Sequence, residues 1–475
     1  MRKYIFRAFL AILALAWASC QKDNQRFVYD KLNTVSIKTA DSSFVITQLD
    51  TLSIQTQLTE SIPSGDSYTY EWKAYMVGEN AVILSDKKDL KVAVNLSPGS
   101  YDLIYTVTSV KTGISSFMLY PLTVNGAFYE GWLVAANQDG KARLSFIRAN
   151  DSVFFSPAED VNKTTYPGKA LGVNAGITSS YANLALVMFY TDQGVYRFNA
   201  DNFIQNGTTA DIFPEPKQFS ASCAYAMSKI PYDQYIVADG GLYAGIGPLF
   251  YPQDVLKPYS ERLTGDYNLF PVVINSATAV TLFYDNKYRR FMSVPLGDRM
   301  LSPVSASPGA VFNMADVGKK MIGWDYGTQS VISSDEIYFV MQDDAGIRYL
   351  YSLKGATPEL SQQIGNSPDI EKASAFAASG VVKHLYYAAG NKIYLYDILA
   401  NSSKMVYTFP DGVKIKDLKM LSITSKRIVV ATNTGTAGEV YYFDLDNLGD
   451  IINHTYVKKF TGFGEIINLS YRSAN

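Results

Sequence analysis

Residues 385–397, Leu-Tyr-Tyr-Ala-Ala-Gly-Asn-Lys-Ile-Tyr-Leu-Tyr-Asp, are the most informative stretch of this sequence, because variants of them recur through its C-terminal three quarters. Aromatic and aliphatic residues alternate on both sides of Gly390-Asn391, a pattern that predicts two strands joined by a tight turn. Both turn residues tolerate the positive φ angles that such a turn requires. We therefore expect a β-hairpin here.

Six further stretches repeat this hairpin pattern at steps of about fifty residues, which is typical of the blades of a β-propeller. We predict an all-β propeller over 131–475, with seven blades. The final strand, Glu465–Arg472, has no hairpin partner, and we expect it to complete a blade begun near Gly131, because ring closure removes exposed sheet edges. The other copies lie at Leu133–Phe146, Leu186–Asn199, Tyr235–Tyr243, Thr281–Phe291, Ile337–Ser352 and Ile428–Asp444.

Two insertions, Gly241–Phe270 and Leu296–Ser330, interrupt the regular spacing of the hairpins and are rich in aromatic residues. Long loops on a rigid ring are often functional, and aromatic rings stack on sugars and other flat ligands. The alternative is that these rings pack on neighbouring blades. The candidate ligand-binding residues are Tyr243, Phe250, Tyr251, Tyr259, Trp324 and Tyr326.

Residues 27–125 contain seven short alternating stretches separated by turn residues, which predicts an immunoglobulin-like β-sandwich. Trp72 falls on a central strand, where such sandwiches bury a tryptophan. Tyr101 follows the Pro98-Gly99 turn, as a tyrosine corner would. We expect Leu52–Leu58 to be one strand and residues 126–130 to be a linker to the propeller.

The N-terminus has the form of a bacterial lipoprotein leader. Arg2, Lys3 and Arg7 precede a short apolar run, and Trp17-Ala18-Ser19-Cys20 ends it. The run is too short for a stable membrane span, so we expect residues 1–19 to be a cleaved signal peptide. Cys20 would then carry the lipid and residues 20–26 would form a tether. The alternative is an ordinary cleaved signal in which Cys20 has no role.

Several motifs in the first quarter of the chain resemble the PKD-like family of lipoproteins from Bacteroidetes-type bacteria. They are Tyr70–Trp72, the Leu96–Tyr101 turn, Val107–Gly113 and Glu130–Trp132. The resemblance covers roughly residues 27–135. It implies an outer-membrane lipoprotein, facing the cell exterior, that serves a starch-utilisation-type system made of a TonB-dependent transporter and its binding lipoprotein. It also makes nutrient capture the leading functional expectation.

Catalytic and metal-binding motifs are scarce in this sequence. His384 and His454 are the two histidines, and no His/Cys cluster or nucleophile elbow is present, so we expect no metal, no cofactor and no serine hydrolase activity. Acidic pairs such as Glu159-Asp160 and Asp343-Asp344 leave open a propeller glycan lyase or hydrolase that uses channel carboxylates. A structural adhesin is the third possibility. Binding of a glycan or other small ligand without turnover remains our preferred expectation.

Composition supports a globular protein and argues against nucleic-acid binding. The 475 residues are 47% hydrophobic and 18% charged, with 35 Tyr and 4 Trp, which suits strand packing. The formal net charge is −2, and no basic stretch could neutralise a phosphate backbone.

Overall fold

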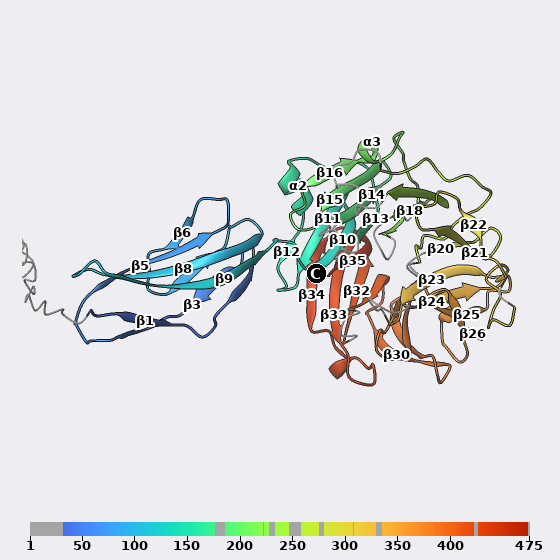
Figure 1. Ribbon diagram of the computed structural model, residues 1–475. Coiled ribbons are helices and arrows are strands. Elements are labelled where there is room, and N and C mark those ends of the chain that lie inside the picture. The colour runs from blue at the N-terminus through green and yellow to red at the C-terminus, as the bar shows by residue number, and fades with distance from the viewer. Residues whose placement is uncertain are drawn as a thin grey trace, which may run out of the picture. The chain divides into compact units, whose positions relative to one another are not determined.

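The computed structural model shows an all-β chain that divides into two compact units, Met1–Val124 and Asn125–Asn475 (Figure 1). The structure describes residues 32–175, 186–221, 223–227, 233–246, 258–274, 280–306, 308–328, 335–421 and 426–473. The two units are described separately below.

The first unit is a β-sandwich built on a five-stranded sheet of order β2-β9-β8-β5-β6, in which β9, β8, β5 and β6 are antiparallel. Two strand pairs, β1-β4 and β3-β7, complete it. The strands are β1 (Val35–Lys38), β2 (Phe44–Thr47), β3 (Thr51–Ile54), β4 (Gln57–Glu60), β5 (Tyr68–Tyr75), β6 (Val82–Ser85), β7 (Leu90–Ala93), β8 (Gly99–Ser109) and β9 (Ser115–Asn125).

The core of the sandwich confirms two predictions. Trp72 is fully buried, stacks on Tyr105 with ring centroids 4.1 Å apart, and donates its indole N–H to the Lys87 carbonyl at 3.1 Å. The Tyr101 hydroxyl donates to the Ser97 carbonyl at 2.8 Å, which forms the expected tyrosine corner. The prediction of one strand over Leu52–Leu58 is wrong, because β3 pairs with β7 whereas β4 pairs with β1.

The second unit is a β-propeller whose described residues form seven antiparallel sheets, one around each predicted hairpin (Figure 1). The first three sheets contain β35 (Glu465–Arg472), β10 (Gly131–Gln138), β11 (Lys141–Arg148) and β12 (Val153–Phe154); β13 (Ala170–Ala175), β14 (Leu186–Thr191), β15 (Gly194–Asn199) and β16 (Gln205–Thr208); and β17 (Ala224–Met227), β18 (Asp233–Ala238) and β19 (Gly241–Ile246).

The remaining four sheets follow the same sequential order, and two short helices, α2 (Pro157–Asn162) and α3 (Thr209–Ile212), lie between strands of the earlier sheets. These sheets contain β20 (Val280–Asp285), β21 (Arg290–Pro295) and β22 (Ser302–Pro303); β23 (Lys320–Tyr326), β24 (Glu336–Gln342), β25 (Arg348–Lys354) and β26 (Thr357–Gln363); β27 (Ala375–Ala378), β28 (His384–Ala389), β29 (Lys392–Asp397) and β30 (Ser402–Thr408); and β31 (Lys414–Met420), β32 (Arg427–Thr434), β33 (Ala437–Asp444) and β34 (Lys458–Phe463).

The hairpin at 385–397 forms as predicted. Ala389 pairs with Lys392, which leaves Gly390-Asn391 as a two-residue turn. Gly390 adopts a φ of +65°, a conformation that glycine reaches without strain. The sequence predicts that Asn391 serves the turn through its backbone. Its side-chain amide also donates a hydrogen bond to the Phe409 carbonyl at 2.7 Å.

Ring closure also follows the prediction, because β35 pairs along the whole length of β10. The chain terminus is held there by side chains as well as by the sheet. The Arg472 guanidinium lies 2.9 Å from the Asp201 carboxylate, and Tyr471 packs on Trp132 with ring centroids 4.8 Å apart. The propeller thus joins the beginning and end of its own sequence in one sheet.

The described residues of the two insertions include strand segments that pair with the propeller sheets. Ser260 N–H donates to the Ala244 carbonyl and Leu263 N–H to the Leu242 carbonyl, so residues 258–263 run beside β19 as an outer strand. Residues 269–274 run beside β20, where Ile274 and Leu282 exchange backbone hydrogen bonds. The second insertion contains β22 and β23.

Residues 126–130, expected to be a linker, belong to the propeller core. Phe128 is 6% exposed and packs edge-to-face against Phe146, Phe154 and Phe203. The prediction failed because a five-residue stretch contains too little pattern to show burial. The division between the units therefore falls at Val124/Asn125.

Asparagines at or near the ends of hairpin strands hold neighbouring sheets together. The Asn137 side chain accepts the Ala170 N–H at 2.7 Å, and Asn286 and Asn433 accept the N–H groups of Met321 and Ile466 at 2.8 and 2.9 Å. Each accepted N–H lies on the first strand of the next sheet. These asparagines therefore satisfy backbone donors and set the contact between blades.

Candidate functional site

The candidate site lies on the strands that begin the sheets and line the centre of the propeller. β23, β27, β31, β35 and β13 follow one another as neighbours around this centre. Trp324, Asp325 and Tyr326 end β23, and Asp417 and Lys419 lie on β31. These five residues are called the inner-strand cluster below.

Asp325 is fixed by the backbone of its own strand and of the next one. Its carboxylate accepts the Tyr326 N–H at 2.9 Å and the Ala378 N–H of β27 at 2.8 Å. Gly323 permits this close approach, because a Cβ atom there would lie 2.2 Å from the Phe376 ring. Burial raises the pKa of Asp325 to about 6, although Lys419 and the two N–H donors oppose that shift.

Asp417 and Lys419 form an ion pair on β31, with Nζ and Oδ1 3.3 Å apart. The Asp417 carboxylate also accepts the N–H of Leu418 and, across the ring closure, that of Leu469, both at 2.8 Å. Burial alone would lower the pKa of Lys419, but Asp417 and Asp325 outweigh it and raise that pKa. The Lys419 side chain keeps 39% of its surface accessible.

Trp324 and Tyr326 bring an aromatic surface to the same strand end. Their rings meet edge-to-face with centroids 5.4 Å apart, and both side chains are half-buried against the core between neighbouring sheets. Because side chains alternate along a strand, both rings lie on the side of β23 opposite to Asp325. The structure thus combines two predicted aromatic residues with three charged residues that the sequence did not single out.

Tyr243 and Tyr259, the candidates from the first insertion, are core residues instead of ligand contacts. They are 8% and 2% exposed and pack around Phe213. The Tyr259 hydroxyl donates to the Gln234 side chain at 2.8 Å. Their assignment as binding residues is therefore wrong. Tyr243 lies on β19, and Tyr259 lies on the outer segment 258–263, where an aromatic residue has the same sequence pattern as one on a loop.

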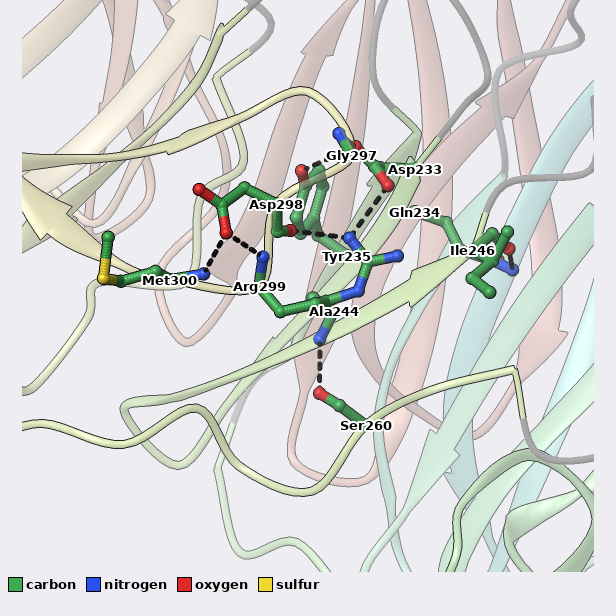
Figure 2. A network of polar contacts seen from close by, with 10 residues as sticks. All are labelled: Asp233, Gln234, Tyr235, Ala244, Ile246, Ser260, Gly297, Asp298, Arg299 and Met300. Carbon is green, nitrogen blue, oxygen red and sulfur yellow. Dashed lines mark hydrogen bonds and ion pairs between the residues drawn. The ribbon is translucent and has the colours of Figure 1, made fainter.

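A buried polar network near these tyrosines fastens the second insertion to β18 (Figure 2). The Asp233 carboxylate, 1% exposed, accepts the Gly297 N–H at 2.6 Å and the Arg299 guanidinium N–H at 2.9 Å. Asp298 caps the same turn by accepting the N–H groups of Arg299 and Met300. The Asp233 carboxylate accepts hydrogen bonds from Gly297 and Arg299 of this turn, so we infer that the network holds the second insertion in place.

Three predicted residues lie outside the described part of the chain. They are Cys20, the lipidation candidate, and Phe250 and Tyr251 from the first insertion. Their assignments stay predictions.

The other groups considered in the sequence have structural surroundings. Asp343 accepts the Ala345 and Ile347 N–H groups of its turn, and Asp344 pairs with Arg289 at 2.5 Å. His384 is half-buried, and burial lowers its pKa. Over the described residues, no three His, Cys, Asp or Glu side chains gather as metal ligands. No described helix has the length and apolar character of a membrane span.

One sequence signal could have pointed to the charged members of the cluster. Lys414–Met420, with the sequence Lys-Ile-Lys-Asp-Leu-Lys-Met, is a strand with acidic and basic residues in its interior, where strands usually avoid them. Such a conflict between composition and position is expected at functional sites.

Comparisons with known proteins bear mainly on the N-terminal region. The sequence model of the PKD-like family matches residues 20–173, less than half of the chain. This match spans the sandwich and extends through the first propeller sheet to Val173 of β13. The class defined by fold and site is thus an all-β protein with an N-terminal PKD-like domain and a C-terminal propeller. No curated protein matches the chain.

Solved structures with similar folds share little sequence with this chain. A quinonprotein alcohol dehydrogenase-like protein from Bacteroides thetaiotaomicron is 13% identical, with 90% of this chain and 97% of the other covered and a TM-score of 0.44. A dihydro-haem d1 dehydrogenase is 10% identical, with 77% and 72% covered and a TM-score of 0.41. At these scores neither protein's activity is transferred to this chain.

Proposed function

We propose that this protein is a lipid-anchored accessory protein of the outer membrane, facing the cell exterior, whose propeller binds a glycan or other small nutrient ligand. In this proposal Cys20 carries the anchor, and the partner is a starch-utilisation-type TonB-dependent transporter with its binding lipoprotein. The PKD-like match supports this class of surface protein.

The inner-strand cluster is the observation that carries the binding proposal. An edge-to-face aromatic pair offers apolar surface on one side of β23, and Asp325 and Lys419 offer an acceptor and a donor on the other side. This mixture of a few polar groups with aromatic rings suits a sugar or another small polar ligand. We propose that Lys419 contacts the ligand directly, because its side chain is 39% accessible.

The test is calorimetric titration of purified residues 21–475 with a panel of oligosaccharides. Trp324→Ala should weaken binding at least tenfold, which corresponds to the loss of about 1.4 kcal/mol of contact energy. Lys419→Met should weaken it as well. Tyr407→Ala is the matched control, because Tyr407 forms a comparable edge-to-face pair with Phe409 on the outer strand β30. Equal loss in control and Trp324→Ala would refute binding at the cluster.

The same samples test a second candidate, a glycan lyase or hydrolase. It is favoured by Asp325, whose pKa of about 6 suits a general acid, beside the Asp417 carboxylate. Product that forms in proportion to protein concentration, and that disappears in Asp325→Asn, would establish this alternative. Binding without product would support the accessory role.

A further inference from the structure

The five-stranded sheet of the sandwich has an unusually apolar outer face. Its inner face is covered by the core that includes Ile37, Leu52 and Leu90. An antiparallel sheet with one solvated side normally places polar residues on that side. Here several outward positions hold apolar residues instead: Val45 (68% exposed), Ile83 (64%), Phe117 (72%) and Leu119 (48%), together with the half-buried Ile104.

Strand register brings these residues onto one face of the sheet as a band, with Lys73 between Ile104 and Ile83. Leu119 of β9 pairs with Ile104 of β8, Ile104 pairs with Lys73 of β5, and Lys73 pairs with Ile83 of β6. Phe117 lies two residues along β9 on the same face, and Val45 comes from the neighbouring strand β2. Such exposed apolar patches on soluble proteins usually mark interaction sites.

We propose that this outer face is a dimer interface between two copies of the chain. The charges beside the band are self-complementary. Glu71 and Lys73 project from the same face of β5, with Nζ and Oε1 2.7 Å apart. In a two-fold arrangement the Lys73 of each copy can approach the Glu71 of the other, so both charges keep a partner on association.

The face is about as large as the smallest specific interfaces. Five strands spaced about 4.8 Å apart span roughly 19 Å, and the nine residues 115–123 extend roughly 27 Å along β9, so each copy offers roughly 500 Å² of flat area. The total is about 1,000 Å², the least that a specific interface buries. Face-to-face stacking of two sheets is a common packing mode. A lipid surface is a poorer occupant, because the Glu71 and Asp102 carboxylates lie on the same face.

Sedimentation velocity of residues 21–475 across a concentration series tests the proposal. The wild type should form a dimer, and Phe117→Ser combined with Leu119→Thr should weaken dimerisation at least tenfold. Leu399→Ser is the control, because Leu399 is 82% exposed on the propeller and lies outside the band. Near-UV circular dichroism checks that each variant keeps its folded sandwich.

A charge exchange gives a second, independent measurement. Lys73→Glu should weaken the dimer through like-charge repulsion with Glu71 of the other copy, and adding Glu71→Lys should restore it. A wild type that stays monomeric throughout, or a dimer that the apolar variants weaken no more than Leu399→Ser does, would overturn the proposal. A monomer that binds its transporter through this face would overturn it too.

Discussion

Replacing Arg472 tests whether the propeller is held closed by a buried ion pair. The Arg472 side chain is 1% exposed and lies 2.9 Å from Asp201, whose carboxylate is 36% exposed. Removing one partner of a fully buried pair costs about 3 to 5 kcal/mol, because the other charge is left without compensation. Asp201 stays partly hydrated, so we expect Arg472→Met to lower the free energy of unfolding by about 2 to 3 kcal/mol.

The matched control is Arg427→Met, which removes an equally close but more exposed pair. Arg427 lies 2.7 Å from Asp444, and both side chains are 35% exposed. Exposed pairs contribute about 0 to 1 kcal/mol, so this variant should lose no more than that. Denaturant unfolding followed by tryptophan fluorescence measures both variants, and Trp132, which packs on Tyr471, reports on the closing strand.

Hydrogen exchange then locates the effect. Arg472→Met should speed amide exchange in β35 and β10, whereas exchange in β28 and β29 should follow global stability alone. A double-mutant cycle with Asp201→Asn should give a coupling free energy of more than about 1 kcal/mol. Equal losses in Arg472→Met and Arg427→Met, with no coupling to Asp201, would refute the role of this pair in closure.

Three further changes have expected outcomes. In the wild type, the raised pKa of Asp325 means that the folded state binds a proton more tightly than the unfolded state, so the free energy of unfolding should fall as pH rises from about 4 to about 6. Asp325→Asn should remove this dependence. Denaturant unfolding at several pH values would show it. Tyr120→Phe should be neutral or up to about 1 kcal/mol stabilising, because the buried Tyr120 hydroxyl has no hydrogen-bond partner among the described residues. Tyr101→Phe should cost about 1 kcal/mol, because it loses the hydrogen bond to the Ser97 carbonyl. Thermal unfolding compares the two variants. Gly390→Ala should cost about 1 kcal/mol in the same measurement, because alanine is strained at a φ of +65°.

The central hairpins were predictable because their signal is local. Alternating residues form the two middle strands of each sheet, which are buried on both sides by neighbouring blades, and Gly or Asp at the turn fixes their register. The Gly390-Asn391 turn and the pairing of β35 with β10 follow from such features. The fold class and the closing strand therefore came from the sequence alone.

The first and last strands of the sheets carry a weaker signal. β22 has two residues, β27 is Ala-Phe-Ala-Ala, and residues 258–263 include a proline and polar residues. Their backbones are held by contacts to strands already formed, so their own side chains need not alternate. Tyr259 was misjudged for this reason, since its burial depends on Gln234 and Phe213 from other segments.

The inner-strand cluster shows how structural and functional demands meet in the same residues. Asp325 and Asp417 each accept a backbone N–H from the next sheet, so the propeller needs an acceptor at both positions whether or not a ligand binds. Lys419 contributes to the fold through its ion pair with Asp417. A lysine is otherwise an unfavourable residue for a strand at the propeller centre. Of the three charged residues, Lys419 is therefore the one whose presence is best explained by a ligand. If Lys419→Met loses binding but keeps its stability, Lys419 serves the ligand. If binding and stability fall together, the cluster has a structural role.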